Sequence, residues 1–124
     1  METLIHPEIK IDNRKSMESW QIKSQLAEIG VPYIEVSWTD SFLISENLQN
    51  YFAEIIAGYS MLELEEEGKD KPNLKKLKEW EESSLDVIHE RRKYHQYNFM
   101  ETQQLLLWLM KESKKVEQLR KNEL

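Results

Sequence analysis

The residues best able to do chemistry lie in the polar cluster that runs from Asp86 to Tyr97. Within it, Arg91 and His95 stand four residues apart and would share one face of a helix. An arginine fork suits phosphate oxygens, and a histidine titrates near neutral pH, so it can move a proton. These residue types would suit cleavage of a phosphodiester bond. The interpretation that we favour is structural, with Arg91 on a solvated helix face and His95 at the polar edge of the core.

The same cluster contains one motif that metal sites use. Asp86 and His89 have the acid-x-x-His spacing of carboxylate-bridged di-iron bundles. Such sites need the motif twice and two further carboxylates from facing helices, whereas this chain has it once. The chain has no cysteine, which excludes thiolate metal sites, disulfides and thiol nucleophiles. We therefore expect no metal and no other cofactor.

Arg91, three intervening residues and then His95, Gln96 and Tyr97 resemble the Arg-x4-6-His motif of HEPN domains. These are helical-bundle ribonucleases, some of which carry a tyrosine two residues after the histidine. The chain departs from the motif by one residue, because Glu90 stands five residues before His95. The resemblance implies a metal-independent site, assembled across a dimer, in which Arg91 stabilises phosphate charge and His95 helps to activate the ribose 2′-hydroxyl. Arg91, His95 and Tyr97 are thus the alternative catalytic residues, and our first expectation is that there are none.

A helical scaffold must position these residues, because apolar side chains recur at helical spacing along most of the chain. We expect a mainly all-α, four-helix bundle-like single domain that can include a short β-ribbon near the N-terminus. Alternation between Tyr33 and Trp38 favours one strand of that ribbon. The expected helices span about 13–29, 46–67, 72–97 and 98–122, and the expected strands span 8–12 and 33–38. The pattern leaves open whether 72–97 and 98–122 form one rod or two helices.

The last expected helix holds the densest apolar run, Leu105 to Met110. Asn98 and Glu101 have the spacing of a capping box at its start. Six apolar residues in a row cover every side of a helix, so other helices of the chain or a second subunit must enclose them. We expect a homodimer or an obligate partner. The partner-binding candidates here are Leu105, Leu106, Trp108 and Leu109.

An acidic run stands at the end of the expected helix 46–67. It comprises Glu63, Glu65, Glu66 and Glu67. Negative charge is unfavourable at a helix C-terminus, so fold stability alone does not require this arrangement. The run is either a solvated face or a docking patch for a basic partner.

Composition narrows the function classes further. The chain has 124 residues and a net charge of −6, which argues against a general nucleic-acid binder. It has no apolar stretch of bilayer length and no apolar core near its N-terminus for a signal peptide, so we expect a cytoplasmic protein. The function that we expect is non-catalytic and acts through protein contacts, as a homodimer, an adaptor or a small subunit of an assembly. The alternatives are the HEPN-like ribonuclease and an acidic inhibitor that occupies a nucleic-acid-binding groove of its target.

Overall fold

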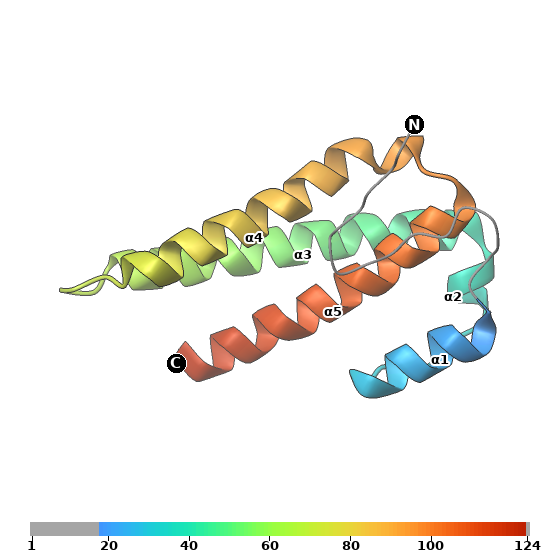
Figure 1. Ribbon diagram of the computed structural model, residues 1–124, viewed down its shortest axis with the longest axis horizontal. Helices are drawn as coiled ribbons and strands as arrows, with labels where there is room; N and C mark the ends of the chain where they lie inside the picture. The colour runs from blue at the N-terminus through green and yellow to red at the C-terminus, as the bar shows by residue number, and fades with distance from the viewer. Residues whose placement is uncertain (1–17, 124) are drawn as a thin grey trace.

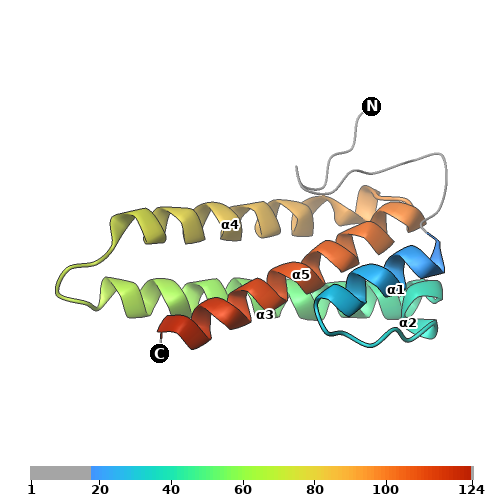
Figure 2. The same cartoon turned by 60° about the horizontal axis from the view of Figure 1, so that its bottom comes forward.

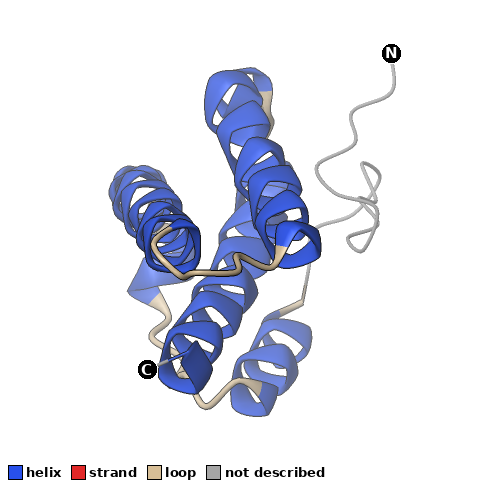
Figure 3. Ribbon diagram, turned by 90° about the vertical axis from the view of Figure 1, so that its left-hand side faces the viewer, coloured by secondary structure: helices blue, strands red, loops and turns tan. Residues whose placement is uncertain are grey.

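A computed structural model describes residues 18–123, and these residues contain helices and no strand (Figures 1 and 3). The elements are α1 Ser19–Glu28, α2 Val36–Thr39, α3 Ser41–Glu67, α4 Leu74–Lys93, the short 3-10 helix η1 Tyr94–Gln96, and α5 Phe99–Glu123. The prediction of a mainly α-helical fold is confirmed. None of the described helices combines the length and the apolar character needed to cross a membrane.

The long helix α3 packs against α2, α4 and α5. It forms an antiparallel hairpin with α4, and α5 packs obliquely along another side of it (Figures 1 and 2). The short helix α2 contacts α3, and α1 lies beside α5. Although α5 holds the densest apolar run, α3 is the helix that contacts both of the other long helices. Its buried stripe at helical spacing supplies that surface, with Ile44, Leu48, Phe52, Ile55, Tyr59 and Leu62.

The single chain buries the apolar run of α5. Every side chain from Leu105 to Met110 has a relative exposure of 8% or less. Helices α3 and α5 approach closely at Gly58, where an added Cβ would lie 2.5 Å from Cγ1 of Val116. A second subunit is therefore not needed to enclose this run.

Polar caps fix where the two main helices begin. The Asp40 side chain accepts hydrogen bonds from the backbone N–H groups of Phe42 and Leu43, so α3 begins at Ser41, earlier than predicted. At α5, Asn98 Oδ1 accepts from the N–H of Glu101, and the Asn98 N–H donates to Glu101 Oε1. The predicted capping box is confirmed.

The predicted strand 33–38 is wrong. Its second half belongs to α2, in which Trp38 is buried while Val36 is exposed, so the alternating residues do not share a buried face. Two contacts favour the helical turn over an extended chain. The Thr39 hydroxyl donates to the Glu35 carbonyl, and Gln103 Nε2 of α5 donates to the Trp38 carbonyl at 2.6 Å.

The segments 72–97 and 98–122 form two helices, because α4 ends at Lys93 and η1 turns the chain before α5 begins. The first described helix begins at Ser19, after a capping box between Glu18 and Gln21, and not at residue 13. Gly30 follows this helix with a φ of 71°, which agrees with the predicted end of the helix at residue 29. The predicted strand 8–12 and residues 13–17 lie outside the described residues.

Candidate functional site

A cleft of about 310 Å³ lies where the start of α3, η1 and the start of α5 meet. Its apolar base comes from Ile44 and Leu48 of α3, which are almost fully buried. The aromatic residues in the lining come from η1 and the adjoining chain, and the side chain of Phe99 is 43% exposed. The lining residues are Ser41, Ile44, Ser45, Leu48, Tyr94, His95, Tyr97, Asn98, Phe99 and Thr102.

The turn η1 positions the aromatic side of the cleft. The ring of Tyr94 lies 5.5 Å from the ring of Phe52, and its hydroxyl accepts a hydrogen bond from Gln49 Nε2 at 3.3 Å. Both of these contacts reach α3. Tyr97 instead reaches back to α4, where its hydroxyl donates to Glu90 Oε1. The two tyrosines therefore tie the connection between α4 and α5 to both helices of the hairpin.

Glu90, the residue at which the chain departs from the HEPN motif, is a buried acid. Its relative exposure is 3%, and burial raises its pKa from 4.5 to about 7. The Tyr97 hydrogen bond and the Lys93 ammonium act in the opposite direction, and the nearby Asp86 carboxylate adds to the increase. Glu90 falls at helical spacing with the buried residues Trp80 and Val87, which is the signal that could have identified it.

A second buried acid, Glu101, lies near Tyr97. Glu101 is 5% exposed, and its Oε2 has no hydrogen-bond partner among the described residues. Its charge raises the pKa of the Tyr97 hydroxyl, after burial and the contact with Glu90, which are the larger causes. The hydroxyl of Tyr97, a lining residue of the cleft, is thus influenced by two buried carboxyl groups.

The structure brings together two of the three alternative catalytic residues. His95 and Tyr97 both line the cleft. Arg91 is exposed on the last turn of α4 and is not among the lining residues. Asp86 and His89, which have the metal-motif spacing, lie on exposed positions of α4. Within residues 18–123 no group of three or more histidines and acids is arranged to hold a metal ion.

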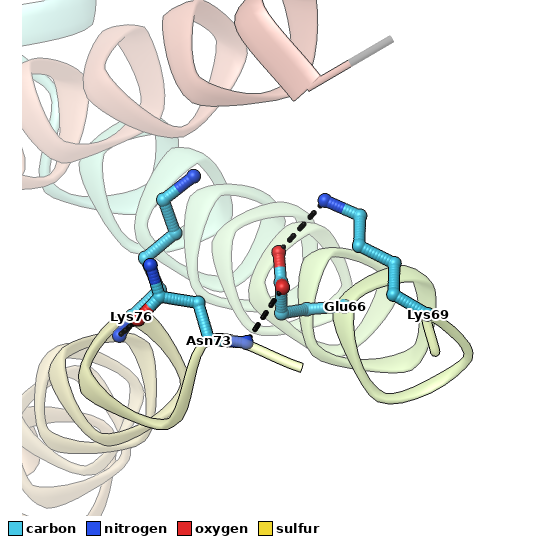
Figure 4. Close-up of polar contacts among 4 residues, drawn as sticks. All are labelled: Glu66, Lys69, Asn73 and Lys76. Carbon is cyan, nitrogen blue, oxygen red and sulfur yellow. Dashed lines mark hydrogen bonds and ion pairs between the residues drawn. The ribbon is translucent and has the colours of Figure 1, made fainter. Parts of the chain in front are cut away.

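The members of the acidic run differ in burial, and Glu66 is the buried one. Glu66 is only 3% exposed, and its carboxylate accepts hydrogen bonds from Lys69 Nζ at 2.9 Å and from the Asn73 N–H at 2.8 Å (Figure 4). These two donors lower the pKa of Glu66, the backbone N–H more than the ammonium. Asn73 Oδ1 in turn accepts from the Lys76 N–H and caps α4. The expectation that fold stability does not require this run is therefore wrong for Glu66, which connects α3 to the start of α4.

The other members of the run remain at the surface. Glu65 and Glu67 are exposed, and Glu63 is partly buried. The pKa of Glu63 is raised by burial and then by the carboxylates of Glu81 and Glu67. Like charges therefore do crowd this end of the hairpin.

The four apolar residues predicted to bind a partner are core residues. Leu105, Leu106 and Leu109 have a relative exposure of 0%, and Trp108 has 2%. The prediction that they contact a partner loses its physical basis, because their burial is complete within the chain.

No family model, no curated protein and no solved structure matches the chain.

Proposed function

We propose that this protein acts without catalysis, by binding a partner protein at the cleft between α3, η1 and α5. One observation carries the proposal. The cleft combines the aromatic residues Tyr94, Tyr97 and Phe99 with the apolar residues Ile44 and Leu48 in one lining, and Phe99 is 43% exposed. Aromatic residues around a concave, apolar base are typical of protein-binding hot spots. The volume of about 310 Å³ is at the lower end of ligand pockets, which suits one inserted side chain.

The other two candidate surfaces are less suited to this role. Leu105 to Met110 are buried, so the argument for self-association through that run no longer applies. Glu66 is engaged within the hairpin, which leaves Glu65 and Glu67 as the exposed part of the acidic run. We therefore assign the contact to a different protein, and the net charge of −6 favours a basic one.

The test is affinity capture from an extract of the source cells with matched variants. Phe99→Asp places a charge in the cleft, whereas Leu64→Asp places the same charge on a side chain that is 69% exposed and far along α3. We expect a protein that the wild type and Leu64→Asp both retain and that Phe99→Asp loses. If every captured protein is retained equally by both variants, the cleft is not the contact and the proposal fails.

The HEPN-like ribonuclease is the second candidate, because His95 and Tyr97 share the cleft. It requires cleavage of single-stranded RNA without added metal, with His95→Ala and Arg91→Ala both inactive at an unchanged melting temperature. We expect no cleavage by the wild type. Metal-independent cleavage that both substitutions abolish would replace the binding proposal.

A further inference from the structure

The cleft has the chemical character of a site for an organic cation. Three aromatic residues, Tyr94, Tyr97 and Phe99, are among those that line it. The face of an aromatic ring carries partial negative charge and attracts ammonium and guanidinium groups that lie within about 6 Å of its centre. Aromatic walls of this kind are used to recognise cations that have shed part of their water.

Two buried acids near the lining residue Tyr97 strengthen this character. Glu90 accepts a hydrogen bond from the Tyr97 hydroxyl, and the Glu101 carboxylate acts on the same hydroxyl from α5. Both carboxyl groups are at most 5% exposed, so water screens them less than it screens surface acids. The ionised form of either carboxyl group adds negative charge near Tyr97, a lining residue, and so favours a cation in the cleft.

The cleft is poorly suited to an anion. The N-termini of α3 and α5 both reach it, but Asp40 already occupies the first N–H groups of α3 with a carboxylate. The capping box of Asn98 and Glu101 occupies the start of α5 in the same way. No lysine or arginine is among the lining residues, and His95 is the one lining side chain that can carry positive charge.

We propose that the cleft binds a lysine or arginine side chain of the partner protein, held against Tyr94, Tyr97 and Phe99. This rests on the proposed function and names what enters the cleft. The small volume admits one extended side chain with a cationic end. The hydroxyls of Ser41, Ser45 and Thr102 are available in the lining to accept its N–H groups.

The experiment is a titration of the 15N-labelled protein, followed by amide chemical shifts, with tetramethylammonium chloride as the probe. Sodium chloride controls for ionic strength, and tert-butanol supplies a neutral molecule of similar size. Phe99→Leu keeps an apolar side chain but removes the ring. Phe42→Leu is the matched control, because Phe42 is 73% exposed and is not a lining residue.

We expect tetramethylammonium to shift the amides around His95, Phe99 and Thr102 in a saturable way, while sodium chloride and tert-butanol do not. Phe99→Leu should weaken this binding by roughly two- to fivefold, and Phe42→Leu should leave it unchanged. Equal binding of tert-butanol would overturn the cation assignment and leave the partner proposal standing, since the cleft would then take an apolar side chain.

Two further outcomes would also overturn the inference. If inorganic phosphate shifts the same amides and tetramethylammonium does not, the cleft prefers anions, which favours the ribonuclease candidate. If no probe binds, the cation site is wrong, and the capture experiment with Phe99→Asp and Leu64→Asp decides the proposed function independently.

Discussion

Glu90 should make the stability of this protein fall as the pH rises from acid to neutral. The folded protein raises the pKa of this carboxyl from 4.5 to about 7, because the side chain is 3% exposed. The folded state therefore holds the proton more tightly than the unfolded chain does. The contribution of protonated Glu90 to the free energy of unfolding is fully present below pH 4.5. It declines as the pH rises and is lost above about pH 7. At about 1.4 kcal/mol per pKa unit, the loss is roughly 3 kcal/mol.

Glu90→Gln tests this directly, because glutamine has the same shape and can still accept the Tyr97 hydrogen bond but cannot ionise. We expect the variant and the wild type to be equally stable near pH 4.5. At pH 8 the variant should be more stable by roughly 3 kcal/mol. Urea unfolding followed by tryptophan fluorescence, at several pH values, measures the difference in the free energy of unfolding.

The matched control is Glu82→Gln, an exposed position on the same helix. Its effect should be small and independent of pH, because an exposed carboxylate is solvated in both states. If the difference in the free energy of unfolding between Glu90→Gln and the wild type is the same at pH 5 and pH 8, Glu90 does not have a raised pKa. The prediction also fails if Glu90→Gln is the less stable protein at pH 8, since the ionised Glu90–Tyr97 contact would then be a net stabiliser.

Three further predictions concern packing and association. Gly58→Ala should lower the melting temperature, since its Cβ would lie 2.5 Å from the stiff Val116 side chain, and the double variant with Val116→Ala should recover part of the loss in a thermal melt. Glu66→Gln should also lower the melting temperature, because an amide cannot serve both donors, whereas Glu65→Gln should leave it unchanged or slightly higher. Size exclusion with light scattering should find a monomer. Leu109→Asp should unfold that monomer, since a buried unpaired carboxylate costs several kcal/mol. A wild-type dimer that Leu109→Asp dissociates into folded monomers would contradict the burial of α5 within one chain.

Local signals in the sequence were sufficient to predict the four longer helices and several of their ends, but not α2. The spacing of apolar residues in α3 and the capping box of Asn98 and Glu101 both involve residues within a turn or two of each other. Such interactions form in the same way wherever the segment lies in the fold. The stop signal at Gly30, after α1, is also local, because a φ of 71° suits a residue without a Cβ.

Tertiary contacts decided what the local pattern left undetermined. Residues 33–38 alternate as a strand would, yet no described strand pairs with them, and the bond from Gln103 to the Trp38 carbonyl joins residues 65 positions apart. An alternating pattern shows which residues could share a face, and a neighbouring strand is still needed to satisfy the backbone.

The candidate site depended on tertiary structure in the same way. The sequence determined that His95 and Tyr97 lie close together, since they are near neighbours in the chain. Only the packing of α3 against η1 and α5 formed the cleft around them, and only the packing of the helices left Glu90, Glu101 and Glu66 at 5% exposure or less. An acid has the same local pattern whether it faces water or a neighbouring helix. Burial is the largest cause of the raised pKa of Glu90, and burial is decided by how the helices pack against one another.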